Sequence, residues 1–464
     1  MGSARSPSWR SSGPAGPAGR GEGMAALHRH PGIRTFLLVW VGQLVSLVGS
    51  GLTAFSLGVW IYQRTDSTTQ YALVTFCAAA PPLVVLPLLG PLIDRWDRKR
   101  LLVACDLVGA AATAVVGLLA WLGSLSLAHA CVIVAVTSSA AALQWPAYSA
   151  TVTLLVPRDQ LGRASGMTQF AFAVSQVIAP LLAGALITLV GLVGVTVLDF
   201  ATFLFSTTLL LVAAIPPGAP ATGEPHGYWR DLPFGWSYVF SHAGLAALLL
   251  MFAAVNFFCE LAAVLFTPLV LNVSTPAALG TILAVGGIGM IGGGALLSVW
   301  GGPRRPALGA VIFSALSGAA VAAAGFTVSV PLLAAAVFVF FFCQPLQTGS
   351  SQVLWQRTVP AELQGRVFSV RATVAMSAVP LASLVAGPLA DRLFEPAMAP
   401  GEPLAATLGP FLGVGPGRGI AVILVVAGAL GLLSAAAAGL FRPLRQLDEA
   451  AAPPPTAAPA CVQS

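Results

Sequence analysis

Twelve apolar runs decide what this sequence can fold into. They can be drawn at about 35–62, 71–93, 101–122, 128–154, 166–189, 192–214, 243–271, 277–300, 306–327, 330–354, 368–391 and 417–441. Each run is long enough to cross about 30 Å of hydrocarbon as an α-helix that rises about 1.5 Å per residue. The sequence therefore predicts an all-α polytopic membrane protein with twelve transmembrane helices.

Composition excludes several other classes of protein. Hydrophobic residues make up 57% and charged residues 8% of the 464-residue chain, which is not the pattern of soluble domains. The net charge of +6 is no nucleic-acid signal, because the basic residues are dispersed over short segments. The histidines and cysteines form no metal-ligand spacing, and we find no Walker motif and no serine–histidine–acid grouping. We expect no metal, no cofactor, no nucleic-acid partner and no enzyme activity.

The basic residues also predict an orientation. If the N-terminus is cytoplasmic, 19 of the 22 lysines and arginines fall in cytoplasmic segments. Only Arg64, Arg392 and Arg418 fall on the outer side. Such a bias is typical of the cytoplasmic side of membrane proteins. We therefore expect a multi-pass protein of the cytoplasmic membrane with both termini inside. Met24 is a candidate for the true start, because no structured segment or cleaved signal is evident before it.

An internal repeat divides the chain into two related halves. Val156–Arg163 recurs as Val359–Arg366, and the same offset of 203 residues (157 to 360) maps Gln144 onto Gln347. A constant offset indicates a duplicated unit, so we expect two pseudo-symmetric six-helix bundles. The predicted domains are a disordered cytoplasmic N-terminal tail at 1–33, bundles at 34–215 and 243–442, a cytoplasmic linker with an interfacial helix at 216–242, and a disordered cytoplasmic tail at 443–464.

A charged turn separates the second apolar run from the third. Its sequence is Gly90-Pro-Leu-Ile-Asp94-Arg95-Trp96-Asp97-Arg98-Lys99-Arg100. A near copy, Gly387-Pro-Leu-Ala-Asp391-Arg392, falls at the outer end of the eleventh run, on the side opposite to the first turn. We interpret the near copy as an incidental likeness.

The twelve runs, the repeat and the turn resemble the major facilitator superfamily. Its signature G-x-L-x-D-R-x-G-R-K is matched at Gly90, Leu92, Asp94, Arg95, Arg98 and Lys99, while Asp97 replaces the glycine. That departure, together with Gly42-Gln43-x-x-Ser46-x-x-Gly49-Ser50 and Gly413-Val-Gly-Pro-Gly-Arg418-Gly, is similar to a branch of exporters that includes macrolide-efflux and enterobactin-exporter proteins. The resemblance covers about residues 33–442.

The resemblance implies alternating access around a central cavity. The first, fourth, seventh and tenth helices would line the cavity, and their polar candidates are Gln43, Ser46, Ser50, Gln144, Trp145, Asn256, Glu260, Gln344, Gln347 and Ser351. Hydrogen bonds that only support helix packing are the alternative for any of these side chains. The resemblance also implies that the signature turn is a gate, with Gly90, Asp94, Arg95, Arg98 and Lys99 locking the outward-open state.

Three intramembrane acids are candidates for proton coupling. Glu260 lies roughly 18 Å deep in its span, where an acid that changes between its neutral and charged forms suits coupled export. A permanently protonated or arginine-paired structural acid is the alternative. Asp199 lies on the peripheral sixth helix, where a structural role that reaches the interface competes with coupling. Asp106 is expected to be a partner of nearby arginines rather than a proton carrier.

These observations predict a secondary active transporter. We expect proton-coupled efflux of an amphipathic small molecule, such as a drug, natural product or siderophore, with the proton gradient as energy source. Its partners would be the substrate, protons and the lipid bilayer, and the chain would be monomeric. A non-transporting sensor or partner of a biosynthetic complex on the same fold, or an importer, remains an alternative.

Overall fold

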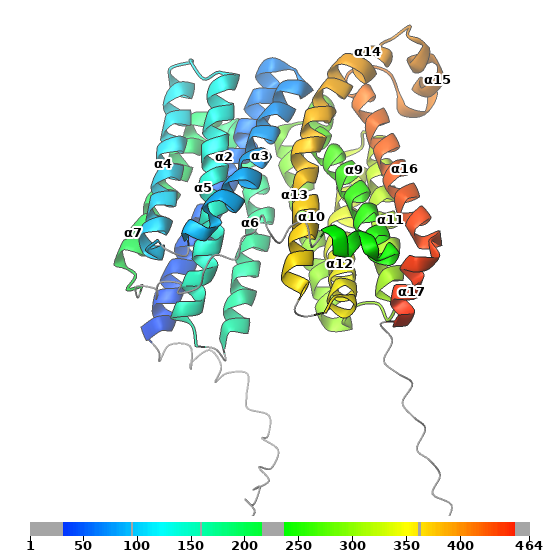
Figure 1. The fold of residues 1–464 in the computed structure, drawn as a ribbon. Coiled ribbons are helices and arrows are strands. Elements are labelled where there is room, and N and C mark those ends of the chain that lie inside the picture. The colour runs from blue at the N-terminus through cyan, green and yellow to red at the C-terminus, as the bar shows by residue number, and fades with distance from the viewer. Residues whose placement is uncertain (1–30, 94–95, 158–159, 216–235, 361–362, 451–464) are drawn as a thin grey trace, which may run out of the picture.

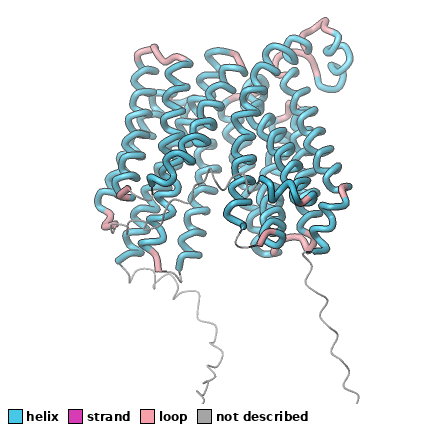
Figure 2. Tube along the Cα trace, viewed as in Figure 1, coloured by secondary structure: helices cyan, strands magenta, loops and turns pink. Residues whose placement is uncertain are grey.

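The computed structural model describes residues 31–93, 96–157, 160–215, 236–360 and 363–450. Within these residues all regular structure is helical (Figures 1 and 2). Twelve helices are long and apolar enough to cross a membrane. They are α2 (Pro31–Thr65), α3 (Thr68–Ile93), α4 (Arg98–Trp121), α5 (Leu127–Leu155), α6 (Leu161–Leu189), α7 (Gly191–Val212), α9 (Ala243–Val273), α10 (Pro276–Trp300), α11 (Pro306–Gly325), α12 (Val330–Thr358), α13 (Gln364–Pro388) and α16 (Arg418–Leu440). The predicted fold class is confirmed.

The helices form two groups that lie side by side. Helices α2–α7 make the N-terminal bundle and α9–α13 with α16 make the C-terminal bundle (Figure 1). Across the two bundles, α3 packs against α13 and α6 packs against α10. The offset of 203 residues maps α3 onto α10 and α6 onto α13. Under the repeat, the contact between α3 and α13 is therefore equivalent to the contact between α10 and α6. The two bundles are therefore related by the pseudo-symmetry that the repeat predicts.

The two ends of the molecule differ. The start of α2 and the short helix α17 (Arg442–Ala450) lie at one end, which we call the terminal end (Figure 1). The other end, called the distal end, carries the short helices α14 (Glu395–Ala397) and α15 (Pro403–Leu412). Helix α17 (Arg442–Ala450) forms where the sequence predicted the start of a disordered tail. Most of the predicted interfacial helix falls in 216–235, outside the described residues.

Local capping explains several helix starts. Asp97 precedes α4, and its side chain accepts a 2.8 Å hydrogen bond from the backbone N–H of Arg100. This contact gives a physical reason for aspartate at the position where the superfamily signature has glycine, because an N-terminal carboxylate satisfies an otherwise unpaired N–H group. Ser126 caps α5 in the same way, and Thr275 caps α10 just before a proline at its first position.

The bundles meet closely at the distal end. Gly184 of α6 and Gly280 of α10 face one another, and a side chain on either glycine would collide with the backbone of the other helix. On the other side of the interface, Asp391 accepts hydrogen bonds from the first residues of α3. Tyr62 accepts a 2.8 Å hydrogen bond from Nδ2 of Asn272. The structure therefore has a closed distal end.

The near copy of the signature turn is not incidental. Asp391 lies beside the loop between α2 and α3, at the end of α3 opposite to Gly90. The relative placement expected from counting spans is confirmed. The interpretation of the copy as a mere likeness is wrong, because its carboxylate bonds across the two bundles. Span counting gives the side on which a motif lies, but it gives no information on what the motif contacts.

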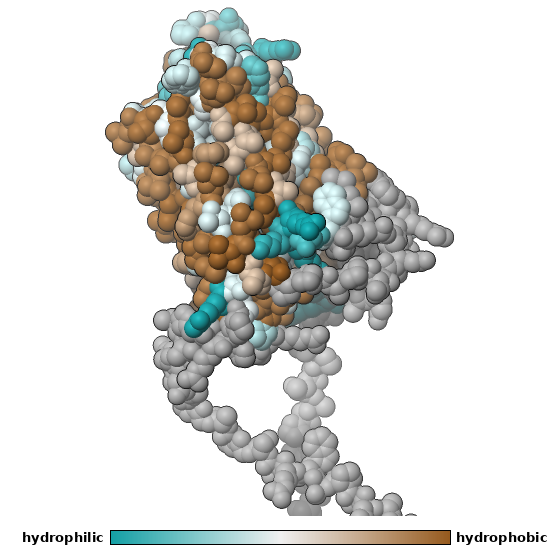
Figure 3. Space-filling view, turned by 90° about the vertical axis from the view of Figure 1, so that its left-hand side faces the viewer, coloured by the Kyte–Doolittle hydropathy of each residue, from teal (hydrophilic) through white to brown (hydrophobic). Residues whose placement is uncertain are grey.

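The sides of the molecule are apolar. Large hydrophobic side chains, among them Leu118, Val132, Leu189 and Val299, are exposed along the spans. Figure 3 shows hydrophobic residues over most of the described part of one such face, with hydrophilic residues gathered toward its upper and lower edges. This arrangement suits lipid along the sides and water at both ends.

Candidate functional site

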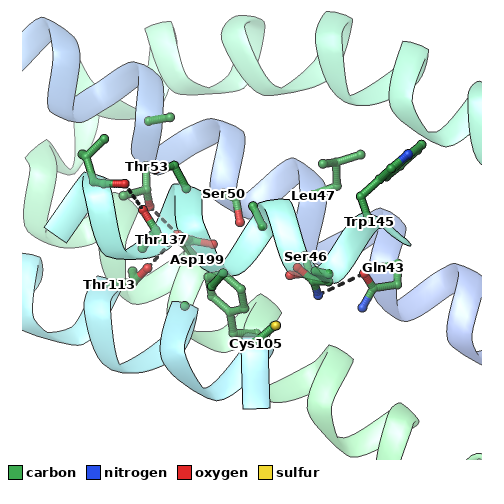
Figure 4. A pocket seen from close by; sticks show the side chains of 18 of the residues that line it. Gln43, Ser46, Leu47, Ser50, Thr53, Cys105, Thr113, Thr137, Trp145 and Asp199 are labelled. Atoms are coloured by element: carbon green, nitrogen blue, oxygen red, sulfur yellow. Dashed lines mark hydrogen bonds between the residues drawn. The ribbon is translucent and has the colours of Figure 1, made fainter. Parts of the chain in front are cut away.

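A cavity lies inside the N-terminal bundle. It has a volume of about 390 Å³ and is lined by residues of α2 to α7 (Figure 4). Five of the residues predicted to line a cavity do so, namely Gln43, Ser46, Ser50, Gln144 and Trp145. Trp145 is 49% exposed, so the wall of the cavity includes a partly exposed aromatic residue.

Two glycines of the first span allow α2 to approach α7. A side chain at Gly42 would lie 3.3 Å from the Cα of Ser206, and one at Gly49 would lie 2.6 Å from Oδ1 of Asp199. Both glycines occur in the exporter-like pattern of the sequence, and they are seven residues apart, on one face of the helix. Their small size brings the polar side chain of Gln43 within reach of Ser206 on α7.

Asp199 lies in the wall of the cavity. It is 1% exposed, and its Oδ2 accepts hydrogen bonds from Thr53 Oγ1 (2.6 Å) and Thr113 Oγ1 (3.1 Å). Thr202 Oγ1 lies 3.3 Å from Oδ1. The expected reach of this side chain to the membrane interface is not seen, because the carboxylate bonds to Thr53 of α2 and Thr113 of α4 inside the bundle (Figure 4). Counting residues along α7 gave the depth of Asp199 but not the side to which it points.

Asp106 lies just behind the cavity wall. The side chain is fully buried, and Oδ1 accepts a 2.6 Å hydrogen bond from Nε2 of Gln144, while Oδ2 accepts a 2.7 Å hydrogen bond from Ser206 Oγ. Nε2 of Gln144 also lies 3.2 Å from Oε1 of Gln43. The expected arginine partner is not found among the described residues, where the partners of Asp106 are side-chain amides and a hydroxyl group. The acid therefore orients Gln144, which does line the cavity.

The two acids form a reciprocal arrangement on α4 and α7. Asp106 of α4 bonds to Ser206 of α7, and Asp199 of α7 bonds to Thr113 of α4. Asp106 and Thr113 are seven residues apart on α4, and Asp199 and Ser206 are seven residues apart on α7. The hydroxyl residues Thr53, Thr113 and Ser206 were missed in the sequence. The spacing of seven between an acid and a hydroxyl residue on both helices could have identified two of them, since it places them on one face.

The predicted residues of the C-terminal half lie elsewhere. Asn256, Glu260, Gln344, Gln347 and Ser351 are described residues, but they line neither this cavity nor a second, largely apolar one of about 220 Å³ in the C-terminal bundle. Gln347 is 2% exposed, and its Oε1 has no hydrogen-bond partner among the described residues. The structure therefore does not bring Gln144 and Gln347 into one pocket, although the repeat relates them.

The residues of the predicted gate are only partly described. Asp94 and Arg95 lie outside the described residues, and Gly90 lies in the last turn of α3. Nη1 of Arg98 donates a 3.1 Å hydrogen bond to the carbonyl oxygen of Ala150. Nζ of Lys99 donates 2.8 Å hydrogen bonds to two carbonyl oxygens at the end of α7. A cation there stabilises the C-terminal end of a helix, so both side chains tie α4 to its own bundle.

We expect Gly49→Ala to destabilise the protein. The added methyl group would collide with Thr202 and Asp199, and overpacking of this kind costs about 1–3 kcal/mol. Thermal unfolding of the purified protein in detergent measures the effect. Gly166→Ala in α6 is the matched control, because nothing lies within 4 Å of the added group there, and it should unfold at the parent temperature or above. Equal unfolding temperatures for the two variants would contradict the close contact.

A family model described as Major Facilitator Superfamily matches residues 39–383. Macrolide efflux protein A of Streptococcus pyogenes is 25% identical over 368 residues, which cover 77% of this chain and 90% of that protein. The multidrug efflux pump Tap of Mycobacterium tuberculosis (strain ATCC 25618 / H37Rv) is 26% identical over 369 residues, which cover 76% of this chain and 86% of that protein.

Solved structures share the fold. A bacterial homologue of the human lysosomal transporter Spinster, in an inward-facing and unoccupied conformation, superposes with a TM-score of 0.67 at 16% identity and covers 91% of this chain and 98% of its own. A bacterial homologue of the iron transporter ferroportin in an inward-facing state has a TM-score of 0.61 at 14% identity, with 87% and 99% of the two chains covered. At such identities the likeness concerns the fold alone.

Proposed function

The chain belongs to the major facilitator superfamily of membrane transporters, and within it we propose that the protein is a proton-coupled exporter of an amphipathic small molecule. The efflux proteins among its relatives support the direction of transport. The observation that carries the proposal is the buried carboxyl group of Asp199 in the wall of a cavity inside the membrane-spanning bundle. Ionisable groups at such depth are costly, and they mark the paths of ions and substrates.

The cavity suits a ligand with an apolar body and a polar group. Its volume of about 390 Å³ falls in the range of small-molecule sites, roughly 300–1,000 Å³. Trp40, Trp145 and Phe203 supply aromatic surface, while Gln43 and Gln144 supply hydrogen-bonding groups. This combination accommodates apolar and polar parts of one molecule without requiring a single shape.

The partners of Asp199 are suited to a group that gains and loses a proton. The hydroxyl groups of Thr53 and Thr113 can donate to an ionised carboxylate, and a hydroxyl oxygen can also accept from a protonated one. The same two hydroxyl groups therefore serve both protonation states. We assign proton coupling to Asp199 and a positioning role to Asp106, which holds Gln144 at the cavity. Glu260 is the competing candidate from the sequence.

Orientation and location complete the proposal. The excess of basic residues in the segments assigned to the cytoplasm supports a terminal end that faces the cytoplasm of a bacterial plasma membrane. In that orientation the closed distal end faces outside, so the state described is one in which the substrate enters from the cytoplasm. The protein would work as a monomer, because each chain holds both bundles.

Accumulation of amphipathic compounds in cells tests the function. We expect cells that express the chain to retain less of at least one compound from a panel that includes macrolides than cells without it, and a protonophore should remove the difference. Equal retention of all compounds by both kinds of cell would count against export. A difference that survives the protonophore would count against coupling to protons.

A further inference from the structure

The two copies of the G-P-L-x-D-R sequence end two helices that pack against each other. One copy begins at Gly90 in the last turn of α3, and the other begins at Gly387 in the last turn of α13. Gly387 lies directly against Thr69 in the first turn of α3, and a side chain at this glycine would collide with the Thr69 backbone. The end of α13 therefore meets the start of α3, and the two helices run in opposite directions.

Asp391 lies where this contact places it, at the N-terminus of α3. The chain after Pro388 forms a π-helical turn, η3 (Leu389–Phe394), that contains Asp391. Oδ2 of Asp391 accepts 2.8 Å hydrogen bonds from Ser67 Oγ and from the backbone N–H of Thr69, and Oδ1 accepts a 3.1 Å hydrogen bond from the backbone N–H of Thr68. All three donors belong to the other bundle.

The chemistry of this contact makes it strong. The first N–H groups of a helix have no partner within the helix, and the helix dipole places partial positive charge there. A carboxylate that accepts several N–H groups makes charge-assisted hydrogen bonds, which are shorter and stronger than neutral ones. Such a contact across two bundles is formed only while the distal ends are together.

We propose that Asp391 is a latch that holds the distal end closed and is released each time the bundles separate there. The carboxylate acts as a remote cap of α3, supplied by the opposite bundle. It is a positioning residue, since it sets the balance between the two open states and need not touch the substrate. The proposal requires the two-bundle fold and alternating exposure, but it does not depend on the identity of the substrate or on proton coupling.

Glu395 provides a matched control at the same end. Its carboxylate accepts hydrogen bonds from the backbone N–H of Gly417 (3.1 Å) and Ile420 (2.9 Å), so it caps the start of α16. Both α16 and Glu395 belong to the C-terminal bundle. Loss of the Glu395 cap should weaken the C-terminal bundle without changing the distance between the two bundles. Loss of the Asp391 cap should let the two bundles separate at the distal end.

Distances between spin labels on the two bundles test the latch. In a background without the six native cysteines, one pair of labels at Ser124 and Ser329 reports the distal end, and a second pair at Thr153 and Arg357 reports the terminal end. The variants are Asp391→Ala, Asp391→Asn and Glu395→Ala. Pulsed electron paramagnetic resonance on the purified full chain in lipid nanodiscs requires no ligand.

We expect Asp391→Ala to raise the ratio of distally open to distally closed molecules by about tenfold, the order of magnitude for loss of a carboxylate cap. The distal pair should then show longer distances and the terminal pair shorter ones. Asp391→Asn keeps one acceptor and should give a smaller shift in the same direction. If the alanine variant does not fold, the asparagine variant alone tests the latch. Parent distances in both Asp391 variants, or an equal shift in Glu395→Ala, would overturn the proposal.

Discussion

Asp199→Asn is expected to reduce export to the level of cells that lack the protein, while the variant still inserts in the membrane. Asparagine keeps the size of the side chain and one acceptor for Thr53 or Thr113, so the packing between α4 and α7 should persist. It cannot exchange a proton, and proton exchange is the role that we propose for this residue. Retention of panel compounds by cells, together with the amount of protein in the membrane, measures the two effects.

Two further variants make this result specific. Asp66→Asn is the control, because Asp66 lies in the distal loop and has a left-handed backbone (φ 48°) that asparagine adopts readily. It should export as the parent does. Glu260→Gln tests the competing acid and should retain coupled export. If Glu260→Gln loses coupling and Asp199→Asn keeps it, coupling belongs to the C-terminal bundle, as the sequence first suggested.

Gly280→Val is expected to abolish transport by a different route. A side chain at Gly280 would collide with the backbone of Pro180 and lie 3.2 Å from the Cα of Gly184. Backbone atoms cannot give way as the tip of a flexible side chain can, so α6 and α10 would be held apart at the distal end. The variant should fold, remain distally open and transport nothing, and retention of compounds by cells measures the loss.

The control for this variant lies on the same helix. Gly294→Val introduces the same side chain into α10, with the same helix propensity, at a position where nothing lies within 4 Å. Transport by the Gly294 variant should match the parent. Transport by the Gly280 variant at the parent level would show that the close approach of Gly184 and Gly280 is not required. Loss of transport in both variants would assign the loss to valine in α10 rather than to this contact.

The fold was largely predictable because its signals lie along the chain. The apolar runs, the repeat at an offset of 203 residues and the charged turn each depend on residue type and spacing, and the structure has the twelve helices and two bundles that they predict. Helix α15 was missed. It lies in a stretch of ten residues, too short for the length criterion that identifies a span.

The site was less predictable because it depends on how the helices are rotated and paired. Gln43 and Gln144 were found, since polar residues in spans avoid lipid. The partners of Asp106 could not be read from its depth, because the nearest arginines in the sequence belong to the turn at the helix start, whereas Ser206 comes from a helix a hundred residues away. Gln347 shows the limit of the repeat, since equivalent positions in the two bundles need not have the same surroundings.

Transport by inside-out membrane vesicles tests whether Asp199 couples export to protons. The test uses the panel compound whose retention in cells changes most, with vesicles that carry either the parent or Asp199→Asn. We expect the parent to accumulate the compound when the vesicle interior is made more acidic than the bath, and we expect a protonophore or the Asp199→Asn change to remove the accumulation. Accumulation that is independent of the proton gradient, or that is the same in both proteins, would contradict this coupling role.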